Sequence, residues 1–191
     1  PVPDVAMIGD AAGALIERGN ALVRQGRVAD ALELYFSAVQ AQPGRFEAQA
    51  NLGSLLLAVD RFGEAETHLR CALALRPEQV PLHVALGQAC SAQGRDTEGE
   101  SCFMDALALA PDDANALVAW AGLLRQRHRF TQAAEAYRRV LKRQPRHALA
   151  HYGLGHCLRE QGLASEAANS FARAVAAQPD YVDAHYRLAV L

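Results

Sequence analysis

The sequence predicts an all-α solenoid of antiparallel helix pairs, and three observations carry that prediction. A proline returns every 34 residues, at Pro43, Pro77, Pro111, Pro145 and Pro179. Between the prolines, the apolar residues form two sets with the spacing i, i+3, i+4 and i+7 of one helix face. A helix-breaking position separates the two sets. A fixed period of this length is typical of solenoid proteins.

Aligned on these prolines, the chain divides into five complete repeats and a partial sixth. The complete repeats are 12–45, 46–79, 80–113, 114–147 and 148–181; residues 1–11 form a lead-in segment and 182–191 the first helix of the sixth repeat. Numbering each repeat from 1 to 34 places apolar residues at positions 4, 7, 8 and 11 of a first helix, and at 20, 24 and 27 of a second. In the lead-in, Val5, Met7 and Ile8 are expected to cover the first helix.

Within each repeat, one residue is expected to adopt a left-handed conformation between the two helices. Gly26, Gly94 and Gly162 stand at this place, where a residue without Cβ closes a helix at low cost. Asp60 and His128 occupy it in the other repeats.

The proline at position 32 ends the second helix, because it lacks an N–H group and restricts the residue before it. Acidic residues follow at Glu78, Asp112, Asp113 and Asp180. We expect them to cap the next helix, whose free N–H groups and positive dipole end favour a carboxylate.

Small residues at positions 8 and 20 are expected to let the paired helices approach closely, and large residues at position 24 to fill the space around them. Position 8 holds Gly19, Gly53, Gly87, Ala121 and Gly155. Position 24 holds Tyr35, Leu69, Phe103, Tyr137 and Phe171.

A period of 34 with Leu-Gly at positions 7 and 8, Ala at 20, an aromatic at 24, Ala at 27 and Pro at 32 resembles the tetratricopeptide repeat (TPR) family. The resemblance covers Ala12 to Leu191. It implies a right-handed superhelix whose first helices line a concave groove, where members of the family bind peptides or other proteins.

The composition fits a folded module without a bias toward one class of partner. A content of 51% hydrophobic residues supplies a core, and a formal net charge of −2 gives no global attraction to nucleic acid or membranes. No apolar run is long enough to span a bilayer, so no membrane insertion is expected. Four scattered cysteines without a CxxC pair favour a reducing, cytoplasmic location.

The resemblance places partner-binding residues at positions 2, 5, 9, 12 and 13 of the first helices. Position 5 of the first three repeats is apolar, with Ile16, Ala50 and Val84, and the groove is expected to become aromatic and basic toward its C-terminal half. The predicted partner-binding residues are Asn20, Ser54, Gln88, Arg125, Tyr152, His156, Arg159 and Tyr186. Arginine and tyrosine suit an extended acidic or aromatic peptide, through charge-assisted hydrogen bonds and stacking. The sequence therefore predicts a protein-protein interaction scaffold.

Other functions stay open beside this one. The chain could be the substrate-docking arm of a larger enzyme, such as a glycosyltransferase similar to O-GlcNAc transferase with a catalytic domain beyond Leu191, or a scaffold in a secretion or envelope assembly. Residues 124–147 hold eight Lys or Arg against Glu135. Without interleaved aromatics, this basic patch favours a solvated face or an acidic protein partner over nucleic acid. Leu188 and Ala189 leave an apolar helix face open, through which we expect self-association.

Catalytic residues, cofactors and metals are not predicted for these residues, which contain no phosphate loop and no nucleophile motif. His147 and His151 have the i, i+4 spacing of two zinc ligands on one helix. However, His83, His151 and His185 all recur at position 4, where a half-buried ring is expected to sit at a helix interface.

Overall fold

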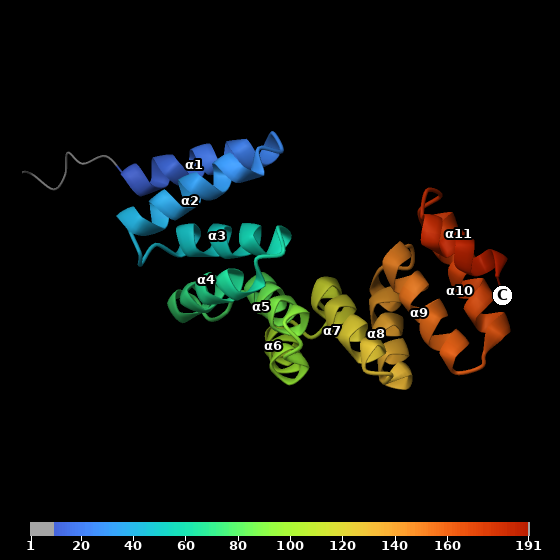
Figure 1. The fold of residues 1–191 in the computed structure, drawn as a ribbon. Coiled ribbons are helices and arrows are strands. Elements are labelled where there is room, and N and C mark those ends of the chain that lie inside the picture. The colour runs from blue at the N-terminus through green and yellow to red at the C-terminus, as the bar shows by residue number, and fades with distance from the viewer. Residues whose placement is uncertain (1–9, 191) are drawn as a thin grey trace, which may run out of the picture. The chain divides into compact units, whose positions relative to one another are not determined.

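The computed structural model describes residues 10–190, which form eleven α-helices and no strand (Figure 1). The chain divides into two compact units, Pro1–Arg95 and Asp96–Leu191. The first contains α1 (Ala11–Arg24), α2 (Val28–Ala41), α3 (Phe46–Ala58), α4 (Phe62–Leu75) and α5 (Val80–Ala92). The second contains α6 (Asp96–Leu109), α7 (Ala114–Gln126), α8 (Phe130–Arg143), α9 (Ala148–Glu160), α10 (Ala164–Ala177) and α11 (Val182–Ala189).

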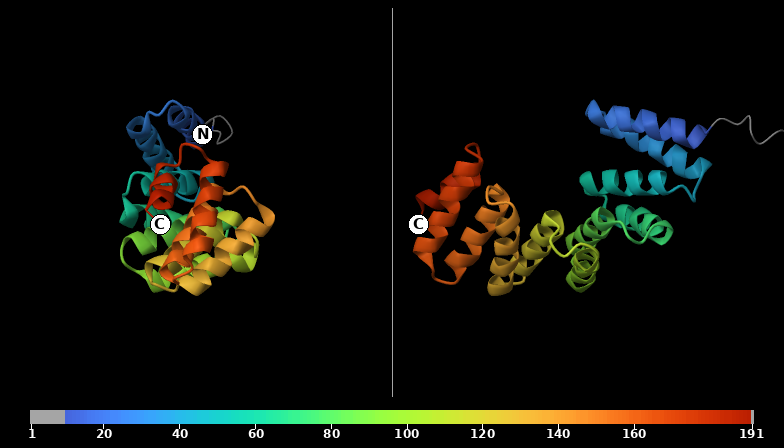
Figure 2. Two further views of the ribbon diagram at one scale, coloured as in Figure 1. Left: turned by 90° about the vertical axis from the view of Figure 1, so that its right-hand side faces the viewer. Right: turned by 180° about the vertical axis from the view of Figure 1, so that it is seen from behind.

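Within each unit, every helix packs on the next one along the chain, as α9 and α10 do in Figure 2. The first helices of neighbouring repeats also touch, α1 on α3, α3 on α5 and α7 on α9. The predicted all-α solenoid of helix pairs is thus confirmed. The expected role of Val5, Met7 and Ile8 lies outside the described residues.

The turns inside the pairs have the predicted left-handed backbone. Gly26, Gly94 and Gly162 have φ angles of 74°, 76° and 79°. Asp60 and His128 adopt the same conformation with φ angles of 60° and 57°, despite their side chains. Among residues 10–190, these five are the ones with positive φ. The turn geometry of the repeat is therefore kept even where the residue carries a Cβ.

The small residues at position 8 are required by the large ones at position 24. A Cβ on Gly19 would lie 2.5 Å from the ring of Tyr35, and one on Gly155 would lie 2.9 Å from the ring of Phe171. Tyr35 and Phe171 are themselves buried. Interior packing leaves no room for such an overlap, so each glycine and its ring form one contact between paired helices.

A hydrogen bond joins most repeats to the next across the proline turn, from the residue at position 4 to the carbonyl of the preceding proline. The bonds are Gln49 Nε2 to Pro43 (2.8 Å), His83 Nε2 to Pro77 (2.7 Å), His151 Nε2 to Pro145 (2.8 Å) and His185 Nε2 to Pro179 (2.8 Å). Position 4 of the fourth repeat is Leu117, which cannot donate, and there Arg139 donates to the Pro111 carbonyl. The position-4 histidines thus bind backbone, and one of them, His151, is buried.

Helix capping follows the prediction at one of the four expected residues. The Asp113 carboxylate accepts a 2.8 Å hydrogen bond from the Ala116 amide and caps α7. The prediction is wrong for Glu78 and Asp180, because the N-caps of α5 and α11 are the residues that follow them, Gln79 and Tyr181, and these make no side-chain hydrogen bond. Asp112 instead pairs with Arg143 at 2.6 Å. His147, which was not predicted to cap, accepts from the Ala150 amide at 3.2 Å through Nδ1 and caps α9.

All four cysteines are described, and none forms a disulfide. Cys71 is exposed, whereas Cys90, Cys102 and Cys157 are buried. Burial raises the pKa of the Cys157 thiol to about 11, so this thiol stays protonated and inert at neutral pH. None of the described helices is both long and apolar enough to cross a membrane.

Candidate functional site

The second unit brings several of the predicted partner-binding residues together on its first helices. Arg125 lies in the last turn of α7, and Tyr152, His156 and Arg159 follow one another at helical spacing along α9. All four side chains are half-buried, so each is accessible while its surroundings hold it. We refer to these four residues, with Arg187 of α11, as the Arg-Tyr surface.

Arg125, Arg159 and Arg187 create a positive environment that is felt by His156. Burial lowers the pKa of His156 below its ordinary value of 6.5, and the charges of the three arginines lower it further, against the opposing charge of Glu160. His156 is therefore neutral at pH 7. Its Nδ1 atom is buried and has no hydrogen-bond partner within residues 10–190.

Only part of this positive charge is neutralised inside the protein. Arg159 pairs with Glu160 at 2.6 Å. In contrast, Arg125 and Arg187 make no ion pair with any carboxylate of the described residues. An anion brought to this surface would meet two guanidinium groups that have no carboxylate to release, which favours charge-assisted hydrogen bonding.

An aromatic cluster supports the Arg-Tyr surface from one side. The ring of Tyr152 lies 5.0 Å from that of Tyr181 and 5.7 Å from that of Phe171, measured between centroids. Tyr181 immediately precedes α11, and burial together with the nearby Tyr152 raises its pKa. Sequence reasoning missed Tyr181, because a residue between two helices falls outside the helical pattern. These two ring contacts hold the Tyr152 side chain in position on the surface.

Tyr137 is buried on α8, close enough to Arg125 for the charge of that residue to act on its phenol. Burial raises the pKa of Tyr137 to about 12, and the adjacent Arg125 opposes that rise. A Cβ on Gly153 would lie 2.3 Å from the Tyr137 ring, so only glycine leaves room for this phenol.

Tyr186 is placed differently from the other predicted residues. It lies on α11 and is 61% exposed. The guanidinium of Arg187 lies 5.8 Å from the centroid of its ring, within the range of a cation–π contact. Tyr186 thus offers an open aromatic face beside the Arg-Tyr surface.

In the first unit, two of the three predicted residues line a small pocket of about 280 Å³. Asn20 and Ser54 line it together with Val23, Tyr35, Asn51, Leu55 and Ala58. The Asn20 Oδ1 atom accepts hydrogen bonds from the Tyr35 hydroxyl at 2.7 Å and from Asn51 Nδ2 at 3.0 Å. The pocket therefore combines a polar wall with an apolar one, at the scale of a single side chain.

Other residues that were assigned to the groove of the first unit contribute little surface. Gln88 is exposed on α5 but is not among the residues that line the pocket. Ile16, Ala50 and Val84 at position 5 are buried, with 4%, 8% and 7% of their surface exposed. The expectation that they form an apolar groove surface is wrong, because these side chains are used in packing between helices.

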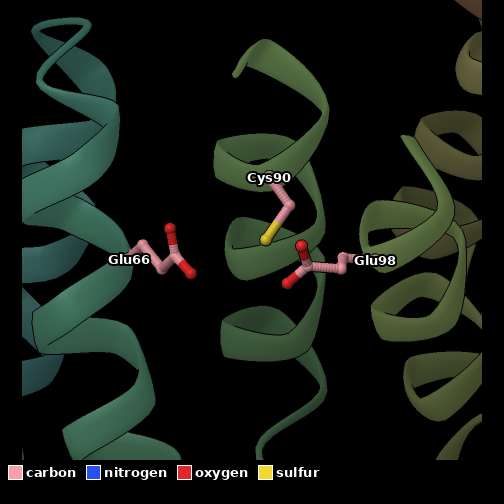
Figure 3. Close-up of side chains that lie close together, drawn as sticks. All are labelled: Glu66, Cys90 and Glu98. Atoms are coloured by element: carbon pink, nitrogen blue, oxygen red, sulfur yellow. The ribbon is translucent and has the colours of Figure 1, made fainter. Parts of the chain in front are cut away.

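A polar cluster near the end of α5 has a structural role. The Glu66 carboxylate on α4 accepts hydrogen bonds from Arg70 at 3.0 Å and Gln93 at 3.2 Å, and it also pairs with Arg95. These bonds, that of Arg95 above all, lower its pKa to about 2. Figure 3 shows Glu66 pointing toward Cys90 on α5; Glu98, also drawn, belongs to α6 of the second unit. The cluster ties α4 to the C-terminal end of α5.

A comparison with models of known protein families identifies the repeat. A family model described as tetratricopeptide repeat matches residues 6–46, 50–114, 118–181 and 158–191. The chain belongs to the tetratricopeptide repeat family. The sequence matches none of the curated proteins with which it was compared.

Solved TPR structures share the fold at low sequence identity. The crystal structure of MamA protein aligns with a TM-score of 0.77 and 19% identity, over 92% of this chain and 96% of that one. YrrB, described as a TPR protein with an unusual peptide-binding site, aligns with a TM-score of 0.72 and 20% identity, over 95% and 94%. TTC0263, a thermophilic TPR protein from Thermus thermophilus, aligns with a TM-score of 0.75 and 20% identity, over 94% and 98%.

Proposed function

We propose that this TPR chain is a non-catalytic protein-interaction scaffold and that it docks an acidic peptide segment of a partner on the Arg-Tyr surface. Two findings support the general role: the family to which the chain belongs, and the likeness to YrrB, which is described as having a peptide-binding site.

The specific proposal rests on the environment of Arg125. Its guanidinium is half-buried in the last turn of α7, makes no ion pair within residues 10–190, and acts on the pKa of Tyr137, His156 and Tyr181. A cation that its surroundings already hold in place loses less conformational freedom when a ligand arrives. A carboxylate of the partner would replace water at Arg125, and a neighbouring apolar or aromatic side chain would pack on Tyr152.

The order of the side chains along α9 suggests how an extended peptide would be recognised. Tyr152, His156 and Arg159 follow one another along the helix and alternate in character between aromatic, neutral polar and cationic. Bound carboxylates would interact with Arg125, Arg159 and Arg187, and the buried Nδ1 of His156 would accept a hydrogen bond from a peptide N–H. An acidic peptide with alternating apolar side chains fits these requirements.

The test starts by capturing proteins that bind this chain from a lysate. The short acidic segment that is responsible for binding is then identified in one of these proteins. The affinity of that segment is then measured for the wild type and for Arg125→Gln/Arg159→Gln, which removes charge and leaves the aromatic packing in place. We expect a loss of at least about tenfold in affinity, since buried or half-buried charge pairs at interfaces contribute more than rim charges.

A control with the same change of charge, Arg24→Gln/Arg146→Gln, should bind like the wild type, because both residues are exposed and lie outside the Arg-Tyr surface. All proteins are first compared by circular dichroism and thermal unfolding. Equal binding by the Arg125→Gln/Arg159→Gln variant and the wild type would show that the Arg-Tyr surface is not the docking site.

A further inference from the structure

A second binding site can be argued on the other helices of the same unit, where α8, α9 and α10 enclose a pocket of about 410 Å³. This volume falls within the range of about 300–1,000 Å³ that is typical of ligand pockets. Arg138 and Lys142 of α8 line it from one side and Arg173 of α10 from the other. No residue of the Arg-Tyr surface lines it.

Some of the basic residues of α8 form ion pairs with a carboxylate, and others do not. Arg139 and Arg143 both pair with Asp112, at 3.7 Å and 2.6 Å. Arg138 and Lys142, which line the pocket, make no ion pair within residues 10–190, and neither does Arg173. Of the described residues that line the pocket, Glu166 alone carries a carboxylate. The rim therefore carries three cations against one anion.

Leucines and polar side chains line the pocket together, and one buried polar atom of the lining has no hydrogen-bond partner in the described residues. Leu154 and Leu158 line it and are 8% and 2% exposed, and Leu141 is half-buried beside them. His151 also lines it and is 5% exposed; its Nε2 donates to the Pro145 carbonyl, while its Nδ1 has no hydrogen-bond partner in the described part of the chain. Buried polar atoms are nearly always hydrogen-bonded, so an Nδ1 without a partner is an unusual feature of the wall of this pocket.

We propose that this pocket, which we name the α8–α10 pocket, binds an acidic amphipathic peptide segment of a partner protein. One apolar side chain would lie on the leucines, flanking Asp or Glu carboxylates would meet Arg138, Lys142 and Arg173, and a peptide N–H would donate to His151. Among the described residues, no Tyr, Trp or Phe lines the pocket, so it lacks the stacking surface that single-stranded nucleic acid requires. An inorganic anion would use the cations but neither the leucines nor the nitrogen acceptor.

The probe is a fluorescein-labelled peptide of about a dozen residues with leucine at helical spacing among Asp and Glu, and its binding is followed by fluorescence anisotropy. Arg138→Gln/Lys142→Gln should weaken binding at least about fivefold, and Glu166→Gln should tighten it, because the first change removes attraction and the second removes repulsion. Both changes lie on exposed side chains and leave the core intact.

Three comparisons make the result specific. The matched variant Arg24→Gln/Arg146→Gln should bind the probe like the wild type. Arg125→Gln/Arg159→Gln removes binding of the probe to the Arg-Tyr surface, and when Arg138→Gln/Lys142→Gln is added to this variant it should still weaken binding at least about fivefold. A probe with its leucines replaced by serine should bind at least about fivefold more weakly, since it loses the apolar contact. The methyl NMR signals of Leu154 and Leu158 should shift on addition of the leucine probe.

The proposal is overturned if the probe shows no saturable binding, or if the serine probe binds as well as the leucine probe. It also fails if the loss of binding follows Arg125→Gln/Arg159→Gln instead, which would place the peptide on the Arg-Tyr surface. Tighter binding of a single-stranded oligonucleotide of equal charge would assign the pocket to nucleic acid.

Discussion

Gly122 and Gly162 show how one residue type serves two opposite purposes in this chain. Gly122 lies inside α7, and a Cβ on it would meet nothing within 4 Å. Gly162 closes α9 with a φ of 79°, and a Cβ there would also meet open space. Packing is therefore the same for both, and only the backbone conformation differs.

Replacing each glycine by alanine should change stability in opposite directions. Gly122→Ala should raise the free energy of unfolding by about 0.5–1 kcal/mol, because alanine favours a helix interior. Gly162→Ala should lower it by about 1–2 kcal/mol, because a left-handed conformation strains any residue with a Cβ. Urea unfolding of both variants measures this; shifts of equal sign would contradict it.

Glu66 makes the stability of the first unit depend on pH. Its pKa is lowered from 4.5 to about 2 in the folded protein, chiefly by Arg95. A carboxyl with a depressed pKa stabilises the fold above its unfolded pKa, and this contribution is lost as the pH falls toward the folded pKa. The side chain is 15% exposed, so solvent screens these bonds only in part.

Glu66→Gln should lower the free energy of unfolding by about 1–3 kcal/mol at pH 7, since donors that now bind a carboxylate would face an amide. The difference from the wild type should stay constant above about pH 5, shrink below 4.5 and vanish near pH 2. Chemical unfolding at several pH values tests this. The control Glu64→Gln, on an exposed pair with Arg61, should change little at any pH.

At the scale of the helix, the start of α7 differs from the start of α11. Asp113 caps α7 through the Ala116 amide, whereas the residue before α11 makes no side-chain cap and Asp180 stands one position too early. Asp113→Ala should therefore cost about 1 kcal/mol of stability, and Asp180→Ala less than about 0.5 kcal/mol. Thermal unfolding distinguishes them, and equal losses would show that general charge at the turn matters more than the cap.

Helices, turns and close helix contacts could be predicted from sequence because they depend on residues a few positions apart. The left-handed turns at Gly26 and Asp60 and the contact of Gly155 with Phe171 all follow from the repeat register. The α8–α10 pocket could not, because it depends on which arginines find a carboxylate. Asp112 and Arg143 are 31 residues apart, and nothing in the spacing says that Arg143 is paired while Arg138 is not.

The candidate site could be predicted only in part from the sequence, for the same reason. Arg125, Tyr152 and Arg159 were found through their positions in the repeat, yet their environment depends on Tyr137 and Tyr181, which lie on other elements. The repeat pattern predicts that the apolar residues at position 5 of the first unit line the groove, whereas in the structure they are buried. Position in a repeat predicts the direction of a side chain better than its exposure.

At the scale of the whole chain, a destabilising substitution in one repeat should weaken mainly that repeat and its neighbours, because repeats in a solenoid contact only the adjacent ones. Leu52 is fully buried on α3, which packs on α1, α2, α4 and α5 of the first unit. Leu52→Ala should lower the stability there by about 2–5 kcal/mol.

Hydrogen exchange read by mass spectrometry can locate the loss. Amides of α2, α3 and α4 should exchange faster in the Leu52→Ala variant, while those of α9 and α10 should keep their protection. Equal acceleration in both units would instead mean that the chain unfolds as one cooperative structure.

The hydrogen bond from position 4 to the preceding proline has a consequence for how such a chain can grow. Donor and acceptor are six residues apart wherever the bond is made by Gln49, His83, His151 or His185, so the whole bond is encoded at one junction. A gene segment of one full period carries an intact junction with it when the cuts fall outside the junction. Duplication or deletion of a repeat therefore leaves each of these proline carbonyls with a donor of the same kind, and the number of repeats can change in evolution without a compensating mutation at the join.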